Sequence, residues 1–346
     1  MGRPSSFKEN IPSFSKKLSG IDMGALNLAA YPKTYLQLLL NNQQYYLRIY
    51  AHVLDKLFEN INKPKEEMVL IDYGAGNGLL GMFAKHCGVA TVYLNDQSAL
   101  FVEASMQLAK VLEINIDGFI TGDCIELEKY FEHKTKPDAI AGTDVIEHIY
   151  NLDEFFIRIA KLNPEMVTVF TTASVTSNPF KTKQLMRLQY NDEFYGSNPD
   201  HAMPGDVYAG LPFIETRKKI ILEQYPAMKK EALESLAFST RGMNKHDLLI
   251  AAGKFIQEGF LPSPPHPTNT CDPVTGSWTE RLLTIKEYDQ MYKRAGFELK
   301  VYNGFYNQWQ AGAKSIVLNL LNKIIFLGGK RGDFIAPFIT LVGKKK

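Results

Sequence analysis

The stretch Val69-Leu-Ile-Asp-Tyr-Gly-Ala-Gly-Asn-Gly78 decides the fold of this chain. Its apolar, β-rich start ends in Asp72, and the chain then turns through Gly74, Gly76 and Gly78 into an amphipathic segment. Glycine suits such a turn because it adopts unusual φ values and lets the backbone approach a ligand without a Cβ in the way. The acid before the glycines would repel a pyrophosphate, whereas it suits a ligand that carries an ammonium group.

A second short β-type run follows the glycine turn and ends in Asp96, 18 residues after Gly78. That spacing leaves room for one helix over residues 79–87, so the two runs predict a βαβ unit. An acid at the end of the second strand is where a ribose diol is held, because one carboxylate can accept from both hydroxyls. Asp96 also suits the N-cap of a helix beginning near Ser98, which is compatible with ribose binding.

Two further runs continue the alternation. Residues 118–124 place Asp123 and Cys124 at a strand end, where we expect an adenine ring to be read. Residues 138–148 run from a buried strand into a loop crowded with ionisable groups, which begins at Thr143 and Asp144.

In this order the four segments resemble the class I S-adenosylmethionine (SAM)-dependent methyltransferases, motif by motif. The resemblance covers residues 66–175 and 278–346. A NAD-binding Rossmann domain, the alternative for the glycine turn alone, would usually show a tighter G-x-G-x-x-G and no acid before its first glycine. The resemblance implies a SAM site made of Asp72, Tyr73, Gly74, Ala75, Gly76, Asn77, Gly78, Asp96, Gln97, Asp123, Cys124, Thr143 and Asp144.

The fold class that follows is α/β: a Rossmann-like, seven-stranded, mostly parallel sheet with helices on both faces. We predict an N-terminal helical arm over residues 1–65, which begins with a polar, mobile stretch and becomes helical from Tyr31 to Ile61. The SAM-binding core with five strands spans 66–175. A largely helical insertion at 176–277 selects the substrate, and residues 278–346 complete the core with two strands, the last of them antiparallel. The strands are expected at 68–73, 91–95, 118–121, 139–141, 166–172, 298–302 and 337–342.

Catalysis is expected near the fourth strand, where Asp144, Glu147 and His148 follow one another. Their Asp-Val-Ile-Glu-His is similar to the Glu-x-x-Glu-His of the ubiquinone-pathway O-methyltransferases and the small-RNA 2′-O-methyltransferases, in which it holds a metal. Asp144 replaces the first Glu, which shortens its reach. Three roles stay open: His148 as a general base, the three residues as ligands of a divalent metal such as Mg²⁺, or a loop that contacts SAM. The resemblance to the small-RNA family adds His201 as a distal histidine.

Residues for the methyl acceptor are predicted from the arm and the insertion. Tyr35 and neighbouring tyrosines of the arm either close over the pocket or pack in the core. In the insertion, Asn269 and Trp278 belong to a polar loop that either lines an acceptor site, with the indole as a flat wall, or serves as a surface connector. Arg241 is placed to meet an anionic acceptor or the SAM carboxylate, or to form a salt bridge.

Composition bounds the class of protein. Of 346 residues, 45% are hydrophobic and 22% charged, which is typical of a globular protein. The net charge of +2 gives no strong field for nucleic acid or membranes. Three dispersed cysteines suit a reducing cytoplasm, and residues 315–327 are too short to span a bilayer.

We therefore expect a cytoplasmic SAM-dependent methyltransferase that acts at oxygen or nitrogen of a small polar molecule, with no nucleic-acid or membrane partner. A metal-assisted RNA 2′-O-methyltransferase is one alternative. A non-catalytic SAM-fold scaffold is the other.

Overall fold

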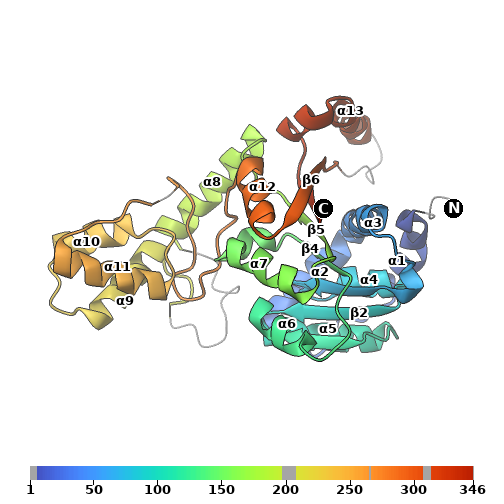
Figure 1. The fold of residues 1–346 in the computed structure, drawn as a ribbon, viewed down its shortest axis with the longest axis horizontal. Helices are drawn as coiled ribbons and strands as arrows, with labels where there is room; N and C mark the ends of the chain where they lie inside the picture. Colours follow the sequence, from blue (N-terminus) through green and yellow to red (C-terminus); the bar gives the residue numbers. More distant parts are fainter. Residues whose placement is uncertain (1–5, 197–207, 265, 307–312, 346) are drawn as a thin grey trace. The chain divides into compact units, whose positions relative to one another are not determined.

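The computed structural model of the chain describes residues 6–196, 208–264, 266–306 and 313–345. They divide into two compact units (Figure 1). Unit 1 comprises residues 1–146, 152–173 and 285–346, and unit 2 comprises residues 147–151 and 174–284. The predicted His201 lies outside the described residues.

Unit 1 is built on a seven-stranded sheet with the order β3-β2-β1-β4-β5-β7-β6. The first five strands are parallel, whereas β7 runs antiparallel to both β5 and β6. This arrangement confirms the predicted fold class. The strands are β1 (Val69–Tyr73), β2 (Thr91–Asp96), β3 (Gly118–Thr121), β4 (Ala139–Thr143), β5 (Val167–Thr172), β6 (Phe297–Asn303) and β7 (Ile339–Lys345).

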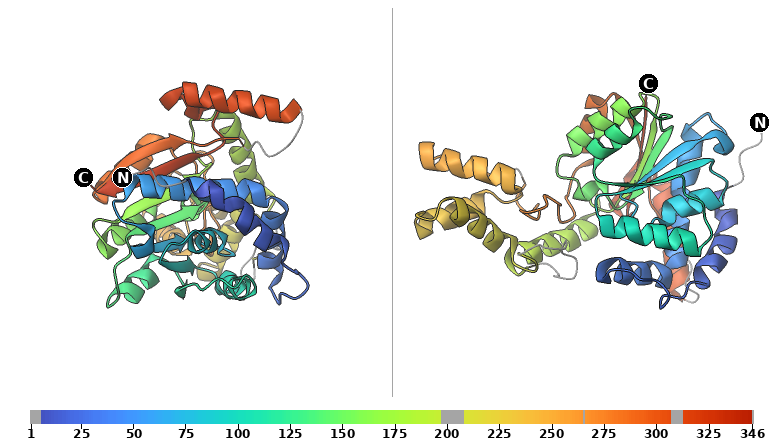
Figure 2. Two further views of the ribbon diagram at one scale, coloured as in Figure 1. Left: turned by 90° about the vertical axis from the view of Figure 1, so that its right-hand side faces the viewer. Right: turned by 90° about the horizontal axis from the view of Figure 1, so that it is seen from below.

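The central strands are the most buried. Every residue of β1 and β5 is buried, as expected for strands covered on both faces, whereas the edge strand β6 is buried mainly at Phe297. Helices lie on both faces of the sheet (Figure 2). One layer packs α6 and α12 against α7, and the other packs α1 and α4 against α3. The helices of the parallel half are α4 (Leu79–His86), α5 (Ala99–Val111), α6 (Cys124–Phe131), α7 (Leu152–Leu162) and α12 (Ile285–Arg294).

Parallel order brings the carboxyl ends of β1 to β5 to one edge of the sheet. The order also reverses beside β1, because β2 follows on one side and β4 on the other. Such a switch point is where open α/β sheets bind ligands. The glycine turn follows β1, and Asp96 ends β2, so the predicted site residues gather there.

The N-terminal arm differs from the prediction in two ways. Its start is helical, because the 3₁₀ turn Phe7–Asn10 and α1 (Ile11–Ser19) carry buried apolar side chains, and Phe14 packs on Phe83 of α4 with ring centroids 5.4 Å apart. The expected long helix is divided at Asn42 into α2 (Ala30–Asn41) and α3 (Gln43–Asn60). Both helices join the core on one face of the sheet.

Unit 2 holds four helices among its described residues: α8 (Pro179–Phe194), α9 (Phe213–Gln224), α10 (Lys230–Ser239) and α11 (Lys245–Glu258). Its small apolar core is formed by α9, α10 and α11 around Ile221, Leu236 and Leu248. An irregular segment over 266–284 closes the unit, and the short stretch 147–151 pairs with it through backbone hydrogen bonds. The helical content predicted for the insertion is present.

Candidate functional site

The glycine turn after β1 has the backbone that only glycine adopts readily. Gly74, Gly76 and Gly78 have φ of 65°, 54° and 77°. A Cβ on Gly74 or Gly78 would overlap the side chain of Val145 or Leu94, so these two positions are closed by packing. A Cβ on Gly76 would have only the ring of Tyr35 within 4 Å, at 3.3 Å. Gly76 is therefore the least closely packed of the three glycines.

Asp72 is a buried carboxylate beneath this turn. Its side chain, 2% exposed, accepts a hydrogen bond of 2.8 Å from the N–H of Gly81, in the first turn of α4. Burial raises the pKa of Asp72 to about 7, and the nearby Asp96 adds to the shift while the Gly81 N–H opposes it. A carboxylate with one backbone donor and a raised pKa lacks compensation for its charge, so a cationic ligand at this end of β1 would stabilise it.

Asp96 is held by the backbone in a fixed orientation at the end of β2. One oxygen accepts from the N–H of Gly76 at 2.9 Å, and the other accepts from the N–H of Ser98 at 2.9 Å. Burial raises the pKa of Asp96, although these two N–H groups oppose the shift. Because an ionised carboxylate offers about four acceptor positions, each oxygen can still accept from a hydroxyl. The prediction that Asp96 is the N-cap of the next helix is wrong, because Ser98 is the N-cap residue of α5. The predicted ribose contact of Asp96 stays compatible with this geometry.

Asn77 supplies an unmet acceptor in the same turn. Its side chain is 1% exposed, and its Nδ2 donates to the carbonyl of Pro32 in α2 at 3.2 Å. Its Oδ1 is buried and has no hydrogen-bond partner among the described residues. Since buried polar atoms are nearly always paired, this oxygen marks a place where a ligand donor fits.

Tyrosines of the arm surround the turn. Tyr31 and Tyr35 of α2 both pack edge-on against Phe101 of α5, at centroid distances of 5.2 and 5.7 Å. Burial raises the pKa of both, and the charge of Asp96 adds to each shift. Tyr35 thus lies beside Gly76 of the glycine turn. The sequence leaves two roles for it, closing over the pocket or packing in the core.

The tyrosines of α3 extend this aromatic group. Burial raises the pKa of Tyr45 to about 12, and the charge of Asp144 adds to the shift. Tyr46 contacts Tyr45 and Tyr50, with centroids 5.2 and 6.4 Å apart. Burial raises the pKa of Tyr50, which was not among the predicted site residues, and the charges of Asp72 and Asp144 add to the shift. Its spacing of four residues from Tyr46 was the available signal.

The other predicted cofactor residues frame the same edge. Asp123 caps α6 by accepting from the N–H of Ile125 at 2.7 Å, and burial raises the pKa of the adjacent Cys124 to about 11. Tyr73 is buried against Phe155. The remaining predicted residues of unit 1 are intermediate or exposed: Ala75, Gln97, Thr143 and Asp144.

Asp144 has a strained backbone. Its φ is 51°, a value that non-glycine residues rarely adopt, and its N–H donates to the carbonyl of Thr171 in β5 at 3.1 Å. Such strain clusters at ligand-binding sites. The strained residue stands at the end of β4, next to the switch point of the sheet.

His148 of unit 2 has a defined tautomer. Its Nδ1 lies 2.8 Å from the carbonyl oxygen of Trp278, and because a carbonyl only accepts, Nδ1 carries the hydrogen. In the neutral ring Nε2 then holds the lone pair, as a general base requires. Trp278 itself is 7% exposed, stacks on Tyr150 at 5.7 Å and donates from Nε1 to the Tyr150 carbonyl. These contacts fix the indole within unit 2, and its role as a wall of the acceptor site stays a prediction.

Metal binding is one of the three roles that the sequence leaves open for Asp144, Glu147 and His148. Among the described residues, no group of three or more His, Cys, Asp or Glu side chains is placed to hold a metal ion. Glu147 is buried in the 3₁₀ turn Ile146–His148, and the hydrogen of His148 Nδ1 is directed to a carbonyl.

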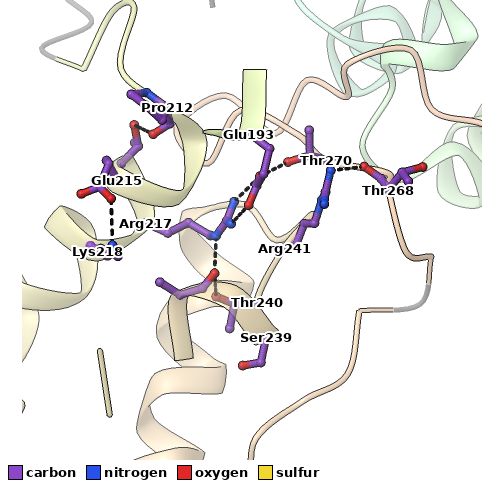
Figure 3. Close-up of polar contacts among 12 residues, drawn as sticks. Glu193, Pro212, Glu215, Arg217, Lys218, Ser239, Thr240, Arg241, Thr268 and Thr270 are labelled. Atoms are coloured by element: carbon purple, nitrogen blue, oxygen red, sulfur yellow. Dashed lines mark hydrogen bonds and ion pairs between the residues drawn. The ribbon is translucent and has the colours of Figure 1, made fainter. Parts of the chain in front are cut away.

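Arg241 and Asn269 make structural contacts within unit 2, and their role toward a methyl acceptor stays a prediction. Arg241 donates to the carbonyls of Pro267 and Thr268, as Figure 3 shows for Thr268. The Oδ1 of Asn269 accepts from Leu282 N–H and from Gln189, and its Nδ2 donates to the Leu282 carbonyl. Both side chains hold the segment 266–284 in place, since irregular backbone must find its hydrogen bonds locally.

Sequence reasoning missed a buried ion pair beside them. Arg217 of α9 and Glu193 of α8 are fully buried and bond through both guanidinium Nη atoms (Figure 3). Arg217 also donates from Nε to the Ala237 carbonyl at 2.9 Å, and Thr270 donates to Glu193 at 2.6 Å. The sequence gives no sign that Glu193, Arg217 and Thr270 are in contact, because they come from three separate segments.

Comparison with protein-family models gave no match, and comparison with curated proteins gave none. Several solved structures are similar to this chain. A magnesium protoporphyrin IX methyltransferase from Synechocystis PCC 6803 with bound SAH is 13% identical over 99% of this chain and 98% of that one, with a TM-score of 0.40. PKMT2 from Rickettsia typhi is 13% identical over 86% and 52%, with a TM-score of 0.43. A Haemonchus contortus phosphoethanolamine N-methyltransferase in complex with S-adenosyl-L-methionine is 11% identical over 86% and 52%, with a TM-score of 0.39.

The chain thus spans about half the length of the last two proteins. Likeness at this level of identity and score does not carry their activities over to this chain. The sheet order and the residues at its switch point are what bear on function.

Proposed function

We propose that this chain is a SAM-dependent methyltransferase that transfers a methyl group to an oxygen or nitrogen of a small polar molecule. The observation that carries the proposal is the glycine turn at the switch point of the sheet. There the N–H of Gly76 is bonded to Asp96, while the side of Gly76 that a Cβ would occupy meets only the Tyr35 ring.

Three features of the turn fit the cofactor. Asp72 is a buried carboxylate with a raised pKa, which suits the ammonium group of SAM. Asp96 has acceptor positions left for a ribose diol, and Asn77 Oδ1 is a buried acceptor with no partner among the described residues. A helix N-terminus and three glycines without an acid would instead favour a phosphate ligand.

When bound, SAM would supply a methyl group that its sulfonium already activates for in-line displacement. The protein then has to align the acceptor and remove its proton. We assign the removal of the acceptor's proton to Nε2 of His148. The imidazole's own hydrogen is held on Nδ1 by the Trp278 carbonyl, so Nε2 is free to take up a proton. The arm tyrosines beside Asp96 and Asp144 would exclude water from the methyl group.

The first test is calorimetric titration of SAM and S-adenosylhomocysteine into the full chain and into Asp96→Ala. We expect micromolar binding and a loss of roughly 1–3 kcal/mol in the variant, since the ribose hydroxyls lose a charged acceptor. The matched control is Asp117→Ala: Asp117, just before β3, accepts from the N–H of Val92 at the start of β2, at the opposite edge of the sheet. Absence of binding by the unaltered chain would favour the scaffold alternative, and equal losses in both variants would remove Asp96 from the site.

The second test concerns His148. With a labelled methyl group on SAM and a panel of small hydroxyl and amine compounds as acceptors, His148→Ala should lower turnover by about 10²-fold or more. SAM affinity should stay nearly unchanged. His246→Ala, an exposed histidine of unit 2, is the control. Full activity of His148→Ala would refute the base assignment while leaving the cofactor assignment intact.

A further inference from the structure

The helix α13 (Ala313–Leu327) of unit 1 is apolar on the side that faces away from the protein. Phe326 and Leu327 are 84% and 82% exposed, and Ile316 is 72% exposed. At 100° per residue, Ile316, Leu320 and Leu327 fall within one narrow stripe. The large apolar side chains exposed on this helix are Ile316, Val317, Leu320, Ile324, Phe326 and Leu327.

The opposite side of α13 is fixed to unit 1. Ile325, which lies opposite the exposed stripe, is buried. Asn322 accepts from the N–H of Tyr306 and donates to its carbonyl, at 2.7 Å in both cases. Figure 1 places the helix beside β6, at the edge of the sheet. The helix is therefore docked through one face, and its other apolar face lacks a covering element in the described part of unit 1.

The charges next to the exposed stripe are mainly positive. Residues 313–333 contain Lys314, Lys323, Lys330 and Arg331 and one acidic residue, Asp333. All four basic residues are exposed. An open hollow of about 410 Å³, lined by Asn319, Asn322, Lys323, Phe326 and Leu327, runs along the same helix. Apolar side chains flanked by lysine and arginine are the composition of helices that lie in the interface of an anionic membrane.

We propose that α13 docks the protein on the surface of an anionic lipid bilayer, with its outer face inserted among the acyl chains and its basic residues at the headgroups. No helix among the described residues is long and apolar enough to cross a membrane, so the contact we infer lies in the plane of the surface. A second copy of the chain is a poorer occupant, because its α13 would bring four more positive charges against these four. The proposal replaces the expectation of no membrane partner and is independent of the methyl-transfer chemistry.

The test is flotation of the full-length protein with vesicles of phosphatidylcholine and phosphatidylglycerol at low salt. We expect binding that weakens by about tenfold or more in the double variant Leu320→Asp/Phe326→Asp, because two anchors are lost and two negative charges gained. Lys323→Gln/Lys330→Gln should weaken binding and reduce its salt dependence. The control is Phe238→Asp in α10, an aromatic side chain that is 60% exposed elsewhere.

Unaltered thermal unfolding and SAM binding would show that the variants are folded. Wild-type protein that stays with the aqueous fraction would overturn the proposal, as would equal binding by Leu320→Asp/Phe326→Asp. Light scattering measures the oligomeric state and so tests the alternative that a second copy covers α13. A dimer that this double variant dissociates, with no vesicle binding, would assign the face to a second copy instead.

Discussion

Asp72 of unit 1 and Glu193 of unit 2 are both buried carboxylates, and their charges are compensated in opposite ways. Glu193 of unit 2 meets the guanidinium of Arg217 and the hydroxyl of Thr270. Within the described residues, Asp72 of unit 1 accepts a hydrogen bond from the N–H of Gly81, and burial raises its pKa to about 7. Equal burial thus produces a closed ion pair in one region and an uncompensated acid in the other.

The partners of a buried carboxylate indicate whether it stabilises the fold or is available to bind a ligand. A charge that leaves water needs a partner, and Glu193 finds its partners within unit 2. Asp72 stands next to the glycine turn, at the switch point of the sheet, where its partner can be a ligand. A strongly shifted pKa in such a place favours a binding role, whereas full pairing favours a role in holding helices together.

The largest effect is expected from breaking the closed pair. Arg217→Met should lower the free energy of unfolding of unit 2 by about 3–5 kcal/mol, because Glu193 is left buried with Thr270 alone. Urea unfolding followed by circular dichroism measures the loss. The adjacent Lys218→Met is the matched control: Lys218 pairs with Glu215 at 2.8 Å at the surface, and such pairs are worth about 0–1 kcal/mol.

The double variant Glu193→Gln/Arg217→Met sharpens the same comparison. It removes both charges, so it should recover much of the stability that Arg217→Met alone loses. SAM affinity should change in neither variant. A destabilisation no larger than that of Lys218→Met would show that Glu193 and Arg217 are less closely coupled than their geometry indicates.

The uncompensated acid predicts a pH dependence of the opposite kind. The pKa of Asp72 is about 7 in the folded chain against an ordinary 3.8, so the folded state keeps a proton that the unfolded chain has lost. Its contribution to stability is complete below about pH 4 and is lost as the pH rises to 7. Asp72→Asn should therefore be more stable than wild type by an amount that grows over this range, on the order of a few kcal/mol.

The same variant should bind SAM more weakly. The cationic ligand stabilises the ionised carboxylate, so wild-type affinity should rise between pH 6 and 8, and Asp72→Asn should lose that rise. Titrations in buffers of different ionisation enthalpy would detect the released proton. Asp117→Asn, at the other edge of the sheet, supplies the control. A pH-independent difference in stability between Asp72→Asn and wild type would mean that Asp72 is ionised or compensated in the free protein.

The two regions also differ in how much the sequence could predict. Asp72 and Asp96 were placed in the site because parallel topology puts strand ends at one edge, whatever the side chains contact. The helix α1 was missed because its apolar residues, such as Phe14, are few and stand among serines and lysines. The contacts of Arg241, Asn269 and Trp278 within unit 2 could not be predicted, because their partners come from distant segments and spacing along the chain carries no trace of such contacts.

The smallest effects are expected from replacing two glycines of positive φ, Gly76 in unit 1 and Gly242 in unit 2. Gly76→Ala and Gly242→Ala impose similar backbone strain, about 1–2 kcal/mol, since their φ values are 54° and 77°. Gly329→Ala, at φ 51° with nothing within 4 Å of an added Cβ, measures that strain alone. The Cβ at Gly242 would meet the Trp278 ring at 2.8 Å, whereas the Cβ at Gly76 would meet only Tyr35 at 3.3 Å.

Thermal unfolding and SAM titration of these three variants separate packing from ligand access. Gly242→Ala should lose more stability than Gly329→Ala and leave SAM affinity unchanged, because its methyl group enters a closed interior. Gly76→Ala should be destabilised no more than Gly329→Ala yet bind SAM about tenfold more weakly or worse, because its methyl group takes the space of the ligand. If Gly76→Ala bound SAM as tightly as the unaltered chain, the added methyl group would not occupy the ligand's space. Gly76 would then lie outside the SAM site.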